Sequence, residues 1–121
     1  MPQNYQNYIA GAWHDGDTTI ENINPSDLSD CIGHYAQANR QQLDKALDAA
    51  ALAQHQWAKT GLEARQTILM NIGTELITRR EELGHLLSRE EGKPLAEGIG
   101  EIYRAGQFFT YYAAETLRQI G

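Results

Sequence analysis

Residues 90–99 read EEGKPLAEGI, and this stretch decides the fold because it ends one predicted helix and begins the next. Gly92 suits the position just after a helix C-terminus, where the backbone commonly turns left-handed. Pro94 suits the first turn of a helix, where the amide hydrogen that proline lacks has no intrahelical acceptor. The sequence therefore predicts two helices joined by a tight turn at Gly92.

The helix after Pro94 is predicted to extend almost to the end of the chain. One stripe of apolar and small residues recurs at steps of three and four: Leu95, Ile99, Ile102, Gly106, Phe109, Ala113, Leu117 and Ile120. Tyr103, Phe108, Tyr111 and Tyr112 lie off that stripe. Because a helix that is apolar on more than one face needs neighbours on more than one side, we expect it to contact another domain or another copy.

Residues 39–91 are also predicted to be helical. Asn39 and Gln42 have the spacing of a capping box, and a helix with Leu43, Ala46, Leu47, Ala50, Ala53 and Trp57 on one face follows them. Residues 60–63 read TGLE, a second capping-box pattern, before a helix with Ile68, Leu69, Ile72, Leu76 and Ile77 on one side. Residues 80–91 continue or restart that helix, with Leu83, Leu86 and Leu87 expected to be buried.

Residues 1–38 predict short strands and turns. Tyr8-Ile9 and Ala12-Trp13 flank Ala10-Gly11, as in a β-hairpin. Residues 18–23 and 31–36 are two further strand candidates, and Pro25 ends the first of them. The expected fold is mainly α with a small antiparallel β-hairpin or sheet at the N-terminus (α+β). Residues 1–38 form its strands and turns, and residues 39–121 form about four helices.

Composition excludes several classes of protein. The formal net charge is -6, which argues against nucleic-acid binding, because phosphates require a basic face. Cys31 is the single cysteine, so the 121 residues cannot form an internal disulfide. Residues 1–8 have neither the basic nor the apolar part of a signal peptide, and no apolar run approaches the roughly 18 residues of a membrane span. We expect a cytoplasmic protein that does not enter membranes.

Residues that could carry chemistry have mostly structural explanations. Cys31 lies in a predicted strand beside Asp30, whose negative charge disfavours a thiolate, so a small packed residue is favoured over a nucleophile. No two of the four histidines have the spacing of metal ligands. Gly98-Ile99-Gly100 lacks the preceding strand and the third glycine of a dinucleotide fingerprint, and close helix packing explains it better.

Carboxylates give one weak candidate site. Glu81-Glu82 and Glu90-Glu91 are adjacent, so each pair points to different faces of a helix and cannot share one proton. Glu97 and Glu101 share a face, and Arg104, three residues after Glu101, could relieve their repulsion. If another segment covered that face, Glu101 would need a cation, and carbonyls at the Ile23-Asn24-Pro25 turn could complete its oxygen shell.

The order of motifs resembles the start of the aldehyde dehydrogenase superfamily over the whole chain. The motifs are residues 8–13 (YIAGAW), 23–26 (INPS), 32–33 (IG), the alanine-rich helix that ends at Trp57, 63–65 (EAR), 79–83 (RREEL), 91–97 (EGKPLAE) and 111–113 (YYA). Residues 24–30 and 90–93 further resemble the branch that acts on 2-oxoglutarate semialdehyde (2,5-dioxopentanoate). The chain is then the truncated N-terminal piece of a larger enzyme.

The resemblance implies an enzyme that oxidises an aldehyde to a carboxylic acid. In the family a cysteine thiolate attacks the aldehyde, hydride passes to NAD or NADP, and a glutamate-activated water hydrolyses the thioester. These catalytic and cofactor-binding residues lie downstream of residue 121, so no catalytic residue and no cofactor site is expected in this piece, which should be inactive alone. One family feature falls inside it: a monovalent-cation site that uses the carbonyl of Ile23, or of Asn22, and the carboxylate of Glu101.

The resemblance also implies an architectural role. The hairpin and helices would pack against the cofactor-binding domain, and Phe108, Phe109 and Tyr112 would line the substrate entrance or form interdomain core. The partner of this piece is the rest of the chain, and the isolated piece should self-associate because its packing surface has lost that partner. The alternative is a stand-alone helical module that self-associates or binds a partner without catalysis, and a third reading is a truncated gene product that keeps the fold without function.

Overall fold

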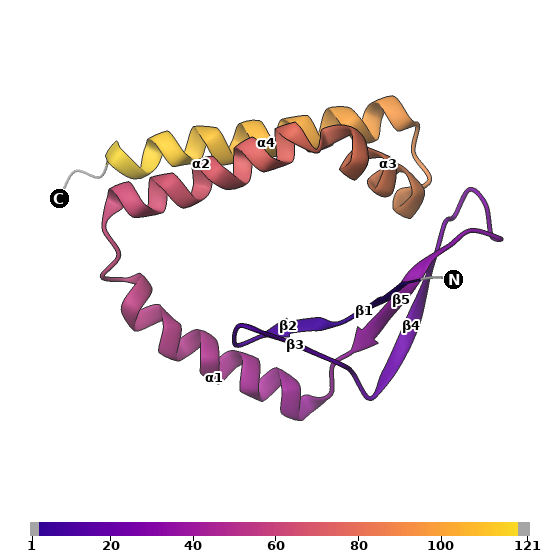
Figure 1. Cartoon of the computed structure of the whole chain (residues 1–121), viewed down its shortest axis with the longest axis horizontal. Coiled ribbons are helices and arrows are strands. Elements are labelled where there is room, and N and C mark those ends of the chain that lie inside the picture. Colours follow the sequence, from indigo (N-terminus) through magenta and orange to yellow (C-terminus); the bar gives the residue numbers. More distant parts are fainter. Residues whose placement is uncertain (1–2, 119–121) are drawn as a thin grey trace. The chain divides into compact units, whose positions relative to one another are not determined.

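The computed structural model describes residues 3–118, in two compact units, Met1–Lys59 and Thr60–Gly121. The first unit contains β1 (Gln3–Tyr5), β2 (Asn7–Ile9), β3 (Ala12–His14), β4 (Thr18–Ile23), β5 (Cys31–Gln37) and α1 (Arg40–Trp57). The second contains α2 (Leu62–Thr78), α3 (Arg80–Glu91), α4 (Leu95–Glu115) and the 3-10 helix η1 (Thr116–Arg118) (Figure 1). The predicted fold class, mainly helical with small sheets at the N-terminus, is confirmed.

The predicted hairpin forms from β2 and β3. Tyr8 pairs with Trp13 in the ladder, and their rings lie 4.9 Å apart between centroids. The two turn residues, Ala10 and Gly11, have φ of 54° and 83°. Two-residue hairpin loops favour a left-handed backbone because it matches the twist of the strands, so the alanine accepts a conformation that glycine adopts more easily.

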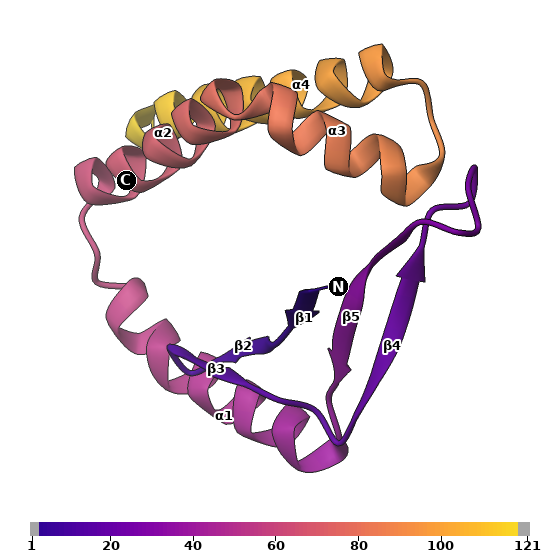
Figure 2. The same cartoon turned by 45° about the vertical axis from the view of Figure 1, so that its right-hand side comes forward.

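A three-stranded sheet has the order β1-β5-β4. β4 and β5 are antiparallel, as Figure 2 shows, with a register irregularity at Asn22 and Ile23. β1 is parallel to β5, so the sheet is not wholly antiparallel as predicted. The sequence did not predict β1, because its three polar residues show no alternation. Gly33 makes this pairing possible, since a Cβ there would lie 2.5 Å from Cε2 of Tyr5.

Helix α1 begins as the sequence predicts and packs on the hairpin through β2. The backbone amide of Gln42 donates to Oδ1 of Asn39 at 2.8 Å, and the amide of Asn39 donates to Oε1 of Gln42 at 3.3 Å. This reciprocal capping box satisfies two amides that the first turn leaves without intrahelical acceptors. The capping box predicted at residues 60–63 does not form: the N-cap of α2 is Gly61, with no side-chain hydrogen bond, so Glu63 falls one residue short of the required position.

In the second unit α4 lies along both α2 and α3, as Figure 1 and Figure 2 both show. The helix restarts at residue 80 rather than continuing, because Arg79 leaves the helical region with φ -95° and ψ 14°. The guanidinium of Arg79 then donates to both carboxylate oxygens of Glu82, at 2.9 and 2.7 Å. This contact is local to the start of α3, and Nη1 of Arg79 also lies 3.5 Å from Oε1 of Glu75 in α2.

Glycines bring the helices of the second unit into close contact. A Cβ on Gly84 would lie 2.6 Å from the Cα of Ile99, and a Cβ on Gly98 would lie 2.5 Å from the carbonyl oxygen of Gly84. Gly73 and Gly106 meet in the same way where α2 crosses α4. Gly98 therefore has the packing role predicted for it, whereas Gly100 has open space around its Cα and does not.

The middle of the predicted stripe of α4 faces α2 and α3, whereas Leu95 and Leu117, two further members of the stripe, are exposed. Gly98, Gly106 and Ala113 are buried, and Ile99, Ile102 and Phe109 are half-buried. Leu83, Leu86 and Leu87 of α3 are half-buried rather than buried. Ile120, the last predicted member of the stripe, lies outside the described residues. Within residues 3–118, no helix has the length and apolar character that crossing a membrane requires.

Candidate functional site

The junction between α3 and α4 carries the most specific sequence motif of the chain. Gly92 ends α3 with φ 70° and donates its amide hydrogen to the carbonyl of Ser88 at 2.9 Å. The hydroxyl of Ser88 donates to the carbonyl of Lys93 at 2.5 Å. The left-handed turn predicted at Gly92 is thus confirmed, and it directs Lys93 back toward the first turns of α4.

Lys93 joins two carboxylates from different helices. Its Nζ lies 2.6 Å from Oε2 of Glu91 and 2.6 Å from Oε1 of Glu101, and only 16% of its side chain is exposed. The hydrogen bond with Glu101, and next the one with Glu91, raises the pKa of Lys93. The ammonium is therefore fully charged at neutral pH. Sequence reasoning assigned the neutralising role to Arg104, but the structure gives it to Lys93.

The cation site predicted at Ile23 and Glu101 depends on the same carboxylate. Ile23 is the last residue of β4 in the first unit, and Glu101 lies in α4 of the second. Because Glu101 already accepts a hydrogen bond from Lys93, an added cation would have to share that carboxylate with an ammonium. The described residues contain no group of three His, Cys, Asp or Glu side chains arranged to hold a metal ion. The site at Ile23 and Glu101 stays a prediction.

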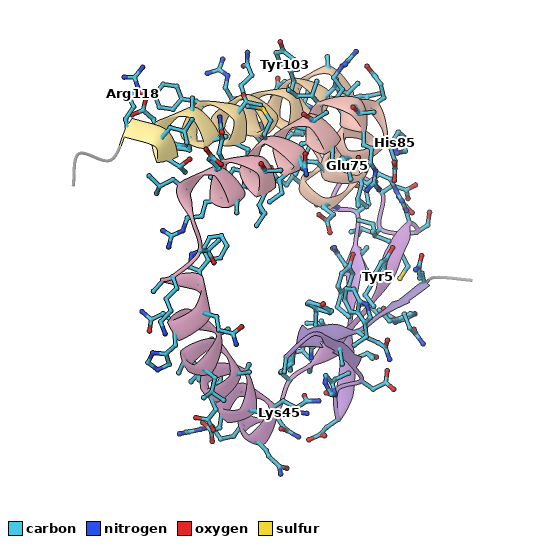
Figure 3. All side chains as sticks on the ribbon, turned by 60° about the vertical axis from the view of Figure 1, so that its left-hand side comes forward. Tyr5, Lys45, Glu75, His85, Tyr103 and Arg118 are labelled. Carbon is cyan, nitrogen blue, oxygen red and sulfur yellow. The ribbon has the colours of Figure 1, made fainter. Side chains whose placement is uncertain are left out.

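Outside its packed stripe, α4 presents an aromatic face with two shallow pockets. One, of about 340 Å³, is lined by Arg104, Gln107, Phe108, Tyr111 and Tyr112. The other, of about 290 Å³, is lined by Leu69, Phe108, Phe109 and Tyr112. Phe108, Tyr111 and Tyr112 are each more than half exposed, although aromatic side chains of this size are usually well covered. Tyr103, labelled in Figure 3, points outward from the same helix.

The remaining candidates have structural roles. Cys31 is half-buried in β5, and its thiol lies 3.9 Å from the carbonyl oxygen of Gly33. Nδ1 of His34 is 3.9 Å from Oε1 of Glu21 on the paired strand β4. Gly98-Ile99-Gly100 lies inside α4, with no strand before it, as predicted. None of these residues supplies a nucleophile beside a base or a phosphate-binding turn.

Comparison with known proteins decides the family. Residues 13–121 match the family model described as the aldehyde dehydrogenase family. The chain belongs to that family. This aldehyde dehydrogenase segment is 36% identical over 112 residues to the alpha-ketoglutarate semialdehyde dehydrogenase of Haloferax volcanii, covering 91% of the segment and 23% of that protein. It is 33% identical over 118 residues to a 1-pyrroline-5-carboxylate dehydrogenase of a Geobacillus species, covering 98% and 23%.

Solved structures agree with the family assignment. Aldehyde dehydrogenase 21 from Physcomitrella patens, in complex with the reaction product succinate, matches this segment with a TM-score of 0.92 and 31% identity. The match covers 100% of the segment and 25% of that chain. The aldehyde dehydrogenase segment thus spans about a quarter of the length of its relatives. The predicted resemblance to the N-terminal part of the family, and to its semialdehyde branch, is confirmed.

Proposed function

We propose that this chain is the N-terminal segment of an NAD(P)-dependent aldehyde dehydrogenase that oxidises 2-oxoglutarate semialdehyde to the dicarboxylic acid. The observation that carries the proposal is the match of nearly the whole chain to the family, combined with a relative named for that semialdehyde. NAD(P), once bound, would accept hydride from the aldehyde carbon. We place the enzyme in the cytoplasm.

The segment itself contributes structure rather than catalysis. A nucleophilic thiol needs a nearby base or cation, and Cys31 instead lies in a sheet with its thiol directed to a backbone carbonyl. The glycine pair at residues 98 and 100 does not fit a dinucleotide fingerprint, because it lies within a helix rather than between a strand and a helix. The nucleophile, the base and the cofactor site are proposed to belong to the rest of the enzyme.

The aromatic face of α4 supports an architectural role. Phe108, Tyr111 and Tyr112 are each more than half exposed, although Gly98, Gly106 and Ala113 of the same helix are buried. Side chains of this kind gain stability when another surface covers them. We propose that the rest of the enzyme covers part of this face and that the remainder borders the substrate entrance.

The function is tested by comparing the full-length enzyme with the segment alone. Each is incubated with 2-oxoglutarate semialdehyde and NAD+ or NADP+, and the absorbance of reduced nicotinamide is followed. We expect turnover by the full-length enzyme and none by residues 1–121. Turnover by the segment alone would refute the assignment of catalysis to other residues, and a gene that stops after residue 121 would refute the enzyme itself.

A second candidate function is self-association without catalysis, and the same exposed aromatic face favours it. Static light scattering of the segment over a range of concentrations tests it. We expect association of the isolated segment, because its aromatic face then has no other protein to cover it. A compact monomer at high concentration would contradict association, whichever candidate function is correct.

A further inference from the structure

The turn between β3 and β4 contains a pair of residues that can rearrange chemically. Residues 15–17 read DGD, and Asp15 is the only aspartate in the sequence that precedes a glycine. The carboxyl group of an aspartate can be attacked by the backbone nitrogen of the next residue. Glycine hinders that attack least, because it has no side chain and leaves the backbone free to reach the required conformation. Asp15 is exposed and belongs to no strand, so water has access to it.

Two glutamine side chains hold Asp15 in its folded conformation. Nε2 of Gln42 donates to the carbonyl oxygen of Asp15 at 2.6 Å, and Nε2 of Gln6 donates to Oδ1 of its carboxylate at 2.9 Å. The same Gln42 side chain accepts the amide hydrogen of Asn39 in the capping box of α1. These bonds restrict rotation of the carboxyl group and of the peptide plane that follows Asp15, and ring closure depends on such rotation. The reaction therefore proceeds from molecules in which the turn has locally opened.

The residue after Asp15 lies tightly against the end of β5. A Cβ built on Gly16 would lie 2.6 Å from the backbone nitrogen of Gln37 and closer still to its carbonyl oxygen. The turn thus has little spare room for a longer main chain. An isoaspartate at position 15 places one more carbon atom in the main chain, because the chain then runs through the side-chain carbons. The rearranged turn would have to give up either the contact of Gly16 with Gln37 or the hydrogen bond from Gln42.

We propose that Asp15 is a site of spontaneous isoaspartate formation and that the hydrogen bond from Gln42 limits its rate. The backbone nitrogen of Gly16 forms a bond to Cγ of Asp15, and the amide hydrogen leaves with a carboxyl hydroxyl group as water, which gives a succinimide ring. Water then opens the ring. Opening at the former main-chain carbonyl gives isoaspartate, with no net change in mass and no need for an oxidant, a cofactor or an enzyme. The modification is independent of the proposed function.

The test ages the purified chain at neutral pH in water enriched in a heavy oxygen isotope, because each ring opening leaves one labelled oxygen at residue 15. Peptide mass spectrometry locates the label, and an endoproteinase that cleaves before aspartate but not before isoaspartate measures the rearranged fraction. Gln42→Glu keeps an oxygen acceptor for the capping box but cannot donate to the carbonyl of Asp15. We expect isoaspartate to form about 2- to 10-fold faster in Gln42→Glu than in the wild type, the effect of losing one ordinary hydrogen bond.

Gln41→Glu is the matched control, because it adds the same charge at an exposed position one residue earlier in α1 and should leave the rate unchanged. Equal rates in Gln42→Glu and Gln41→Glu would overturn control by Gln42. A label that enters residue 15 no faster than Asp17, which precedes threonine, would overturn the site itself. Chain enriched in isoaspartate should unfold at a lower urea concentration than fresh chain, and an unchanged midpoint would refute the tight fit of the turn against Gln37.

Discussion

Gly84 and Gly100 allow a direct measurement of how tightly α3 and α4 pack. Both glycines lie inside helices, so replacing either by alanine should gain roughly 1 kcal/mol of helix propensity. Their surroundings differ. A Cβ at position 84 would lie 2.6 Å from the backbone nitrogen and Cα of Ile99, whereas a Cβ at position 100 has nothing within 4 Å.

The size of the expected effect follows from that distance. To restore ordinary contact at 3.4 Å, the two helices must separate locally by about 0.8 Å, because the obstructing atoms are backbone and cannot rotate away. A gap of that size removes roughly a quarter to a half of the attractive energy of each dispersion contact along the interface. Overpacking of a core typically costs about 1–3 kcal/mol. Since the propensity gain is common to both variants, the difference between them should equal this packing cost.

The assay is urea unfolding of the chain followed by far-ultraviolet circular dichroism, which reports helix content. We expect Gly100→Ala to unfold at a higher urea concentration than the wild type, and Gly84→Ala to have a free energy of unfolding about 1–3 kcal/mol below Gly100→Ala. Equal midpoints for the two variants would refute the close approach of α3 and α4 at Ile99.

Three further predictions concern a cap, an ion pair and the cation site. Asn39→Ala should lower the free energy of unfolding by about 1 kcal/mol in urea titrations, because the capping box of α1 is lost. Asn39→Ser should retain most of this stability, because serine also caps helices. The hydrogen bond from Arg79 lowers the pKa of Glu82, so the stabilisation by this ion pair is present above the ordinary pKa of about 4.3 and is lost as pH falls through the lowered value. The urea midpoints of Glu82→Gln and the wild type should therefore differ at pH 7 and converge in strong acid. A difference that stays constant with pH would contradict this. If a monovalent cation binds at Ile23 and Glu101, removing the ammonium that contacts Glu101 in Lys93→Met should make the melting temperature of the full-length enzyme higher in potassium than in tetramethylammonium. The wild type and the control Lys45→Met should respond less. A melting temperature of Lys93→Met that does not depend on potassium would argue against the site.

Local patterns predicted the features that depend on a few neighbouring residues. The spacing of Asn39 and Gln42 gave the cap of α1, Gly92 gave the left-handed end of α3, and the period of α4 gave its packed stripe. The same pattern at residues 60–63 failed, because spacing alone does not say which residue begins the helix. β1 was missed because its pairing with β5 joins residues about 30 positions apart, and Gln3 and Asn4 show no strand signal by themselves.

The candidate site was less predictable because it depends on which charges meet in space. The i,i+3 rule made Arg104 the natural partner of Glu101, since both lie on α4. Lys93 lies before the helix, and only the turn at Gly92 brings its ammonium to Glu101 and Glu91. Once that contact is known, the role of Arg104 changes from an internal counter-ion to a cation without an internal partner among the described residues.

The two faces of α4 have one physical origin. Close approach to α2 and α3 requires glycine at positions 98 and 106, because a Cβ there would lie 2.5 Å from the carbonyl oxygen of Gly84 or 2.9 Å from that of Gly73. Large side chains are thereby excluded from these close contacts, and Phe108, Tyr111 and Tyr112 lie on the outward face with Arg104. A helix whose only task was to stabilise this unit would gain nothing from that exposed aromatic area. The arrangement is explained if the outward face was selected for contacts beyond the unit.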